Sequence, residues 1–342
     1  MIPFDERWIH QVEKRYGSKR IWEQPDIYRI ATNANMSAAR NLANHLIDSL
    51  PDKPQAKLVS KLRRNMSFSD AFHEVVVGAM LAQNGPLPDY EPELTTGKTP
   101  DWYLPQQDGQ IGCAVEVVSR NVQTSRSLDE LDARLQEIPG ETVLLVSYAS
   151  DYTMMSSGTC KETTSGVRKW LKSDDTAPKS RLRIGGFCLT VVSIRSGLDH
   201  VYTILDPDAT WGSPRPLRRS VTDKVRKYES SCQDGGMALV VAVVADPRAG
   251  SSTYEAMEML FGSVTVPVVV NRSTGQSWTK QPYRAHNGVF ERCPLLSAVA
   301  WVTQNEPDTW TSTLYRNPAC NILLPDQVLK GMQSTLHIAD KL

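Results

Sequence analysis

Pro100-Asp101 and Cys113-Ala-Val-Glu-Val-Val-Ser119 carry two acids, Asp101 and Glu116, on neighbouring strand-like segments. One acid follows a turn-forming proline and the other lies inside an apolar run. An Asp-Gly turn signal at positions 108–109 predicts that the two segments form a hairpin. Buried acids are costly unless a positive group neutralises them, and a divalent cation is a common counter-charge. The hairpin therefore raises the question of a metal site.

The segments on either side of this hairpin predict an α/β fold. An apolar stripe at helical spacing predicts a helix that begins near Ser67 or Ser69 and carries Glu74. After the hairpin, Ser127 to Gln136 has the pattern of an amphipathic helix, and 142–147 has the pattern of a buried strand. This order predicts a mixed central sheet flanked by helices.

The second half of the chain continues the same pattern. Phe187 to Ile194 and His200 to Leu205 are expected to form a strand pair, and Met237 to Ala245 is the most apolar strand. A basic loop is expected at 215–219 and a helix at 220–230. The remaining predicted elements are a helix at 254–261 and strands at 264–270 and 297–302.

Residues 1–65 are predicted to be a helical N-terminal extension, followed by one α/β domain at 66–342 with a surface insertion near 150–180. The second helix of the extension, near 55–64, carries a basic cluster: Lys57, Lys61, Arg63 and Arg64. Such a cluster is most often a solvated helix face, and contact with phosphates is the alternative.

The composition limits the classes of function. Lys and Arg total 38 and Asp and Glu total 38, so any nucleic-acid surface must be a local patch. The six cysteines form no CxxC pair, so zinc-ligand spacing is absent. The start of the chain lacks the apolar segment of a signal peptide, and the longest apolar run is too short to span a bilayer. We expect a cytoplasmic protein with no membrane partner.

The acids suggest a chemistry when they are taken together. Hydrolysis of a phosphodiester needs an activated water and a cation that stabilises charge in the transition state. Asp101, Glu116 and the carbonyl of Val117 offer oxygen ligands of the kind that Mg²⁺ prefers, and Glu74 can approach from its helix.

The order Glu74 … Pro100-Asp101 … Glu116-Val-Val118 resembles the PD-(D/E)XK nuclease superfamily, the restriction-endonuclease-like fold, over about residues 67–147. The resemblance implies that Glu74, Asp101 and Glu116 bind Mg²⁺ or Mn²⁺. It also implies a nuclease that acts on DNA, with defence or restriction as its role.

One position departs from that pattern, because the lysine expected two residues after the second acid is Val118. Arg120 shares a strand face with Glu116 but cannot accept a proton. Lys224 and Lys227 are the preferred replacements, since their helix directly precedes a buried strand.

Three hypotheses stay open at the level of sequence. The first is the metal-dependent nuclease. The second is a catalytically inactive nuclease-like module that binds nucleic acid or a partner protein. The third is a metal-free interaction domain, in which Glu116 forms a salt bridge with Arg120 or a lysine and Glu74 lies at a solvent edge beside His73. Whether the chain forms a homo-oligomer also stays open.

Overall fold

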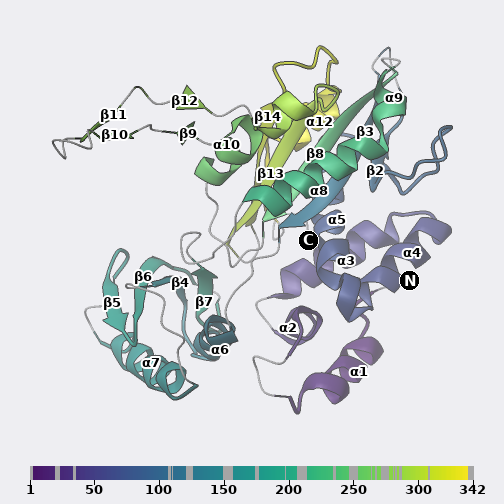
Figure 1. Ribbon diagram of the computed structural model, residues 1–342. Coiled ribbons are helices and arrows are strands. Elements are labelled where there is room, and N and C mark those ends of the chain that lie inside the picture. The colour runs from purple at the N-terminus through teal and green to yellow at the C-terminus, as the bar shows by residue number, and fades with distance from the viewer. Residues whose placement is uncertain are drawn as a thin grey trace.

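The computed structural model describes residues 3–19, 24–33, 36–106, 109, 111–120, 126–148, 157–173, 177–196, 198–205, 214–233, 236–245, 253–262, 264–265, 268–270, 277–279, 281, 283–284, 287–306 and 309–337. Two sheets organise these residues, a large one with helices on both faces and a smaller one beside it (Figure 1).

The large sheet has seven strands in the order β1-β2-β3-β8-β13-β14-β15. Its strands are Asp89–Tyr90, Trp102–Leu104, Gly112–Arg120, Met237–Ala245, Ala298–Glu306, Thr309–Arg316 and Thr335–His337. The three central strands β3, β8 and β13 are parallel, and the strands on both sides of them are antiparallel. The predicted mixed sheet flanked by helices is therefore confirmed.

Strand β8 lies in the middle of this sheet because its sequence permits burial on both faces. All nine of its residues are apolar and buried. A parallel strand covered on both faces is expected to have such a continuous apolar run. Strand β3 differs from it by a charged residue in its middle, Glu116, and a second one at its end, Arg120.

The N-terminal helices and α5 cover one face of the large sheet. Helices α1 to α5 are Glu6–Tyr16, Asp26–Thr32, Ser37–Asp48, Asp52–Leu62 and Phe68–Ala82, with a 3-10 turn at Asn65–Ser67. Helix α5 is buried around most of its circumference, because α2, α3 and α4 pack on it from outside while the sheet lies beneath it. The predicted helical N-terminus is confirmed.

A second group of helices covers the opposite face. Helices α8 to α11 are Pro214–Lys227, Glu229–Gln233, Thr253–Phe261 and Val289–Arg292. On α8 the buried residues Leu217, Val221 and Val225 recur at helical spacing, and the helix packs on β3 and β8. The expected basic loop at 215–219 is wrong, because this segment is the first half of α8.

The smaller sheet, at the lower left of Figure 1, has the order β5-β6-β4-β7. Its strands β4 to β7 are Thr142–Tyr148, Arg181–Ile184, Phe187–Ile194 and Tyr202–Leu205, and its helices α6 and α7 are Arg126–Leu135 and Ser157–Trp170. The strand predicted at 142–147 therefore does not join the large sheet. It is β4, and the two strands expected to pair with each other, β6 and β7, pair with β4 instead. The unit encloses an apolar core of its own.

The chain after α10 also differs from the prediction. The single strand expected at 264–270 consists of two short strands, β9 (Val264–Thr265) and β10 (Val268–Val270), which pair with β12 (Tyr283–Arg284) and β11 (Ser277–Thr279). Strands β14 and β15 and helix α12 (Asp326–Gly331) were not predicted. Within the described ranges, each helix is too short or too polar to cross a bilayer.

Gly78 on α5 allows that helix to lie directly on Trp102 of β2, and the contact can be tested. A Cβ at Gly78 would overlap the fully buried indole ring. A Gly→Ala change within a helix ordinarily stabilises by about 1 kcal/mol. Overpacking of a core costs about 1–3 kcal/mol, so we expect Gly78→Ala to lower the free energy of unfolding, measured by urea denaturation.

Gly236→Ala is the matched control, because a Cβ there meets no atom within 4 Å. A Gly78→Ala protein as stable as wild type would contradict this packing.

Candidate functional site

The register of the β2–β3 hairpin brings Asp101 next to Glu116. Trp102 is paired with Val115, so the residues one step further along, Asp101 and Glu116, face each other across the two strands. Asp101 Oδ2 accepts a hydrogen bond of 2.7 Å from the backbone N–H of Val117. Both acids are buried, and Glu116 has no exposed surface.

The alternation of side chains along β3 decides which helix Glu116 meets. Cys113, Val115 and Val117 belong to the core on the α5 side, whereas Ala114 and Val118 pack with α8. Glu116 has the parity of the second set and therefore points at α8.

Helix α8 supplies the positive charge that the motif position lacks. Lys224 Nζ lies 3.3 Å from Asp101 Oδ2 and also forms an ion pair with Glu116 Oε2. Lys227 Nζ lies 3.0 Å from Glu116 Oε1 and donates to the carbonyl of Thr99 at 2.9 Å. The hydroxyl of Tyr228 donates to Glu116 Oε1 as well. The two lysines named from the sequence thus meet the two acids named from the sequence.

The other residues predicted around this site have less direct positions. Val118 is buried against α8, so an apolar residue suits the position. Val117 contacts the site through its N–H, and a role for its carbonyl stays a prediction. Arg120 is the last residue of β3, and its side chain lies outside the described part of the structure.

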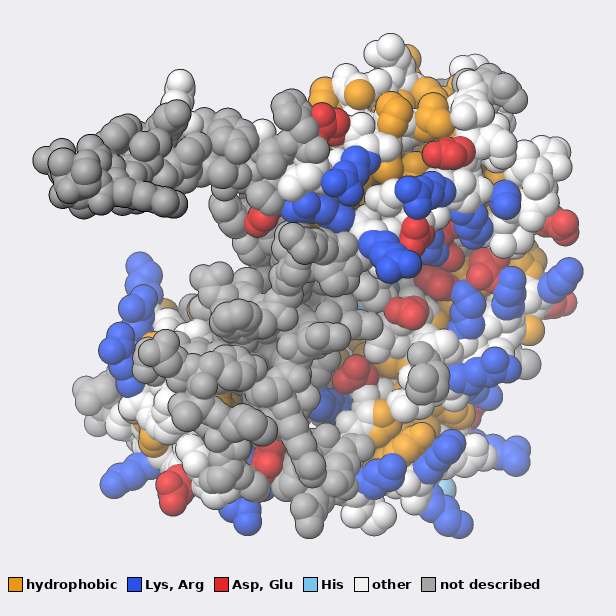
Figure 2. All heavy atoms as spheres, viewed as in Figure 1, with side chains coloured by type: hydrophobic (Ala, Val, Ile, Leu, Met, Phe, Trp, Pro, Cys, Tyr) orange, Lys and Arg blue, Asp and Glu red, His pale blue; other side chains and the backbone are white. Residues whose placement is uncertain are grey.

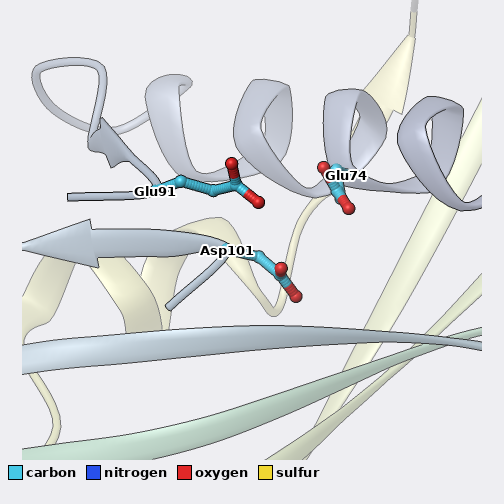
Figure 3. Close-up of side chains that lie close together, drawn as sticks. All are labelled: Glu74, Glu91 and Asp101. Atoms are coloured by element: carbon cyan, nitrogen blue, oxygen red, sulfur yellow. The ribbon is translucent and has the colours of Figure 1, made fainter. Parts of the chain in front are cut away.

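A second set of contacts surrounds Glu74 on the α5 side. Figure 3 shows Glu74, Glu91 and Asp101 around one space between α5 and the sheet. One carboxylate oxygen from each lies within 4.8 Å of the other two. Lys61 Nζ is 3.0 Å from both oxygens of Glu74 and 2.9 Å from Glu91, and the Tyr90 hydroxyl donates to Glu74 at 2.6 Å.

Glu74 does not lie at a solvent edge, because it is only 7% exposed. The helix α5 that carries it is covered by the N-terminal helices, and Trp102 Nε1 donates to its backbone carbonyl at 2.8 Å. The neighbouring His73 is also buried, with Nδ1 2.9 Å from Ser119 Oγ.

Sequence reasoning missed Glu91. Its backbone has a φ of 45°, a left-handed conformation that is uncommon for residues other than glycine, and its N–H donates to the carbonyl of Asp101 at 3.1 Å. Strained backbone of this kind concentrates at functional sites. The signal in the sequence was an acid placed directly between a strand-like segment and Pro92.

The basic cluster on α4 is not simply a solvated face. Lys61 and Lys57 both form ion pairs with Glu91, and Arg63 pairs with Asp5 at 2.6 Å. Lys57 and Lys61 therefore neutralise the α5 side of the site much as Lys224 and Lys227 neutralise the α8 side.

The four acids have different proton affinities. Burial and the charge of Glu116 raise the pKa of Asp101 to about 7. Burial also raises the pKa of Glu74, which Lys61 only partly offsets. For Glu116 burial is outweighed by Lys224, Tyr228 and Lys227, so its pKa is lowered. The pKa of Glu91 is lowered in the same way, with ion pairs to Lys57 and Lys61 prevailing over burial.

The residues present fit a divalent cation. Two oxygens of one Mg²⁺ or Ca²⁺ shell lie at most about 4–5 Å apart, twice the ligand distance, and the Glu74, Glu91 and Asp101 oxygens all lie within 4.8 Å of one another. All donors in the group are carboxylates, the ligand type of hard cations. Such an ion would compete with Lys61 and Lys224 for the same oxygens.

Comparisons with models of protein families, with curated proteins and with solved structures found no match for this chain.

Asp101→Asn tests the electrostatics of the site through stability. The ordinary pKa of Asp101 is 3.8 and its folded value is about 7. Between these values the unfolded chain ionises while the folded carboxyl keeps its proton, so wild-type stability falls as pH rises from about 4 to about 7. The Asn side chain does not ionise, so the variant does not lose stability in this way. We expect its free energy of unfolding, relative to wild type, to increase between about pH 4 and about pH 7 in metal-free buffer.

Asp89→Asn, at an exposed position on β1, is the control and should follow the wild-type profile. At the higher pH, addition of Mg²⁺ or Mn²⁺ should raise the free energy of unfolding of the wild-type protein but not that of Asp101→Asn. Parallel pH profiles for wild type and Asp101→Asn would contradict the raised pKa.

Proposed function

We propose that the protein is a Mg²⁺- or Mn²⁺-dependent nuclease that hydrolyses phosphodiester bonds, with DNA as its substrate. One observation carries the proposal: a single ammonium group, Lys224 Nζ, contacts two buried acids, Asp101 and Glu116, that face each other across neighbouring strands. Two acids and a lysine are the functional groups of the PD-(D/E)XK pattern, with the lysine supplied by a helix instead of by Val118.

The residues would have different roles in such a site. Glu74, Glu91 and Asp101, whose oxygens lie together, would hold the ion, and Glu116, which shares Lys224 with Asp101, would be a further ligand from the α8 side. A bound divalent ion would lower the pKa of a water and stabilise charge on the phosphate. Burial lowers the pKa of Lys224, but the carboxylates of Asp101 and Glu116 outweigh it and the pKa is raised. The lysine therefore stays charged and stabilises the negative transition state instead of acting as the base.

The surface around the acids suits a polyanion. Figure 2 shows Lys and Arg side chains gathered over α8 and over α4, with acidic side chains between the two groups. On α8, the side chains of Arg219 and Arg226 are 86% and 68% exposed, so they are accessible to phosphates. Since the chain has no net charge, this local concentration is the feature that would attract a nucleic-acid backbone.

The arrangement of elements supports a restriction-endonuclease-like fold as part of the proposal. A helix bearing Glu74 precedes the antiparallel hairpin bearing Asp101 and Glu116, and the parallel strand β8 follows next to β3. A cytoplasmic location belongs to the proposal because the six cysteines, all within the described ranges, form no disulfide with one another, as in a reducing compartment. A role in restriction or defence rests on the resemblance alone.

The alternative is a catalytically inactive nuclease-like module that binds nucleic acid or a partner protein. It is favoured by the charge balance of the site, since the carboxylates of Glu74, Glu91, Asp101 and Glu116 are matched by the ammonium groups of Lys57, Lys61, Lys224 and Lys227. A network that is already neutral does not require a cation for folding.

A cleavage assay separates the two proposals. We expect wild type to cut supercoiled plasmid or single-stranded DNA in Mg²⁺ or Mn²⁺ and to be inactive in EDTA, with RNA tested in parallel. Asp101→Asn and Glu116→Gln should lose activity because they remove ligands while keeping shape. Lys224→Met should lower the turnover rate by about 10²–10³-fold, the range for removal of one group that stabilises transition-state charge.

Arg226→Met is the matched control, because it removes an exposed charge from the same helix without contacting the four acids, and it should keep near-normal turnover at saturating substrate. Thermal unfolding of each variant identifies a loss that comes from misfolding. Equal cleavage by wild type, Asp101→Asn and Glu116→Gln would place the chemistry elsewhere. Binding of nucleic acid without cleavage under either metal would support the inactive module.

A further inference from the structure

A cavity of about 110 Å³ lies near the carboxyl end of β13, where the large sheet meets α2, α5 and β7. Gln304 near the end of β13 and Trp310 near the start of β14 contribute to its lining. His73, which contacts Ser119 near the end of β3, lines it as well. Ligands of open α/β sheets characteristically bind at this edge.

Several residues that line the cavity are aromatic. Phe72, Tyr202 and Trp310 line it, and the rings of His73 and Trp310 meet edge to face with centroids 6.3 Å apart. Flat faces of this kind are suitable surfaces for stacking a planar ring.

Trp310 provides a hydrogen-bond donor that the described protein residues do not satisfy. The residue is 1% exposed, and its Nε1 has no hydrogen-bond partner among them. Arg29 Nε, on another wall of the cavity, has none there either. A buried donor without an acceptor costs free energy, which a ligand with acceptor atoms on its edge would recover.

The polar side of the cavity is rigidly arranged. Gln136 Nε2 donates to Asp132 at 3.1 and 3.2 Å and to Thr203 at 2.8 Å, and Thr203 also donates to Asp132. Arg29 approaches Asp132 to 3.8 Å. The charged residues of the lining, Asp26 and Arg29, balance each other when His73 is neutral, so the cavity favours an uncharged polar ring.

The cavity is close to the proposed catalytic acids. Ser119 is three residues beyond Glu116 on β3, about 10 Å along the strand, with its side chain toward α5 and that of Glu116 toward α8. A wider hollow of about 720 Å³ adjoins the cavity, because both are lined by Arg29, Asn33 and Gln136. Arg168 and His200 also line that hollow and can face a phosphate backbone.

From these features we infer that the cavity binds an unpaired nucleobase of a nucleic-acid strand whose backbone runs past Asp101 and Glu116. The inference rests on the proposed function, because a strand must pass the acids. Aromatic rings stack on the base, and Trp310 Nε1 donates to an acceptor on its edge. The protein therefore prefers strands with an accessible base, either single-stranded or opened at one position.

The test is equilibrium binding of a labelled single-stranded DNA in EDTA, so that cleavage plays no part. The probe is a ten-nucleotide strand, compared with a strand of equal length whose bases are replaced by abasic sites. We expect wild type to bind the base-bearing strand at least about tenfold tighter, and Trp310→Phe to lose about tenfold of that preference. The four nucleoside 5′-monophosphates, used as competitors, should bind far more weakly than the strand.

Trp301→Phe is the matched control, since Trp301 is also a buried tryptophan with an unpaired Nε1 but packs in the core on the α8 side. If Trp310→Phe is too unstable to measure, Gln304→Leu removes another polar group of the lining and should reduce the preference similarly. Equal binding of the two strands by wild type, or an unchanged preference in a folded cavity variant, would overturn the inference. So would a mononucleotide that binds as tightly as the strand.

Cleavage of both strands in Mg²⁺ keeps this outcome separate from that of the proposed nuclease. Equal cutting of base-bearing and abasic strands would leave the nuclease standing and refute the cavity. A base preference without cleavage would support the cavity and refute the nuclease.

Discussion

Glu116 carries a negative charge into the middle of the large sheet, and much of the surrounding structure accommodates it. The carboxylate has no exposed surface, so its charge is tolerated only because Lys224 and Lys227 reach it from α8 and Tyr228 reaches it from the turn that follows. These contacts fix the rotation of α8, since Val221 and Val225 then pack on the sheet. Replacement of a buried ion pair by apolar residues is often neutral or stabilising. Stability alone therefore does not account for this network.

Asp101 links the two halves of the site. On one side it shares Lys224 with Glu116, and on the other its carboxylate belongs to the group formed with Glu74 and Glu91. Asp101 lies further from Lys224 Nζ than Glu116 does, so this ion pair is the weaker of the two. Burial and repulsion from Glu116 therefore raise the pKa of Asp101 to about 7. A group in this state can exchange a proton for a cation at low cost. The site thus combines a firmly ionised carboxylate with an adaptable one.

The features that depend on local pattern were predictable from sequence. A turn signal between two strand-like segments was enough to predict the hairpin that pairs Asp101 with Glu116. The position of its helix directly before β8 was enough to predict that Lys224 supplies a positive charge to the acids. Features that depend on tertiary partners were not predictable. Strand β4 has the apolar pattern of a buried strand, and that pattern does not say which sheet buries it. Glu91 reaches the site through a left-handed backbone that no sequence periodicity reports.

The position of β8 between β3 and β13 has a consequence for how the molecule assembles during synthesis. Strands β1 to β3 and the complete smaller sheet leave the ribosome before β8. Until residues 214–245 emerge, Glu116 has neither its lysines nor the neighbouring strand. In a nascent chain, β3 is therefore an open sheet edge on which Glu116 is not neutralised. A charged side chain that points inward on an open edge discourages that edge from pairing with other chains. The same charge that the finished protein must neutralise thus protects the unfinished one from aggregation.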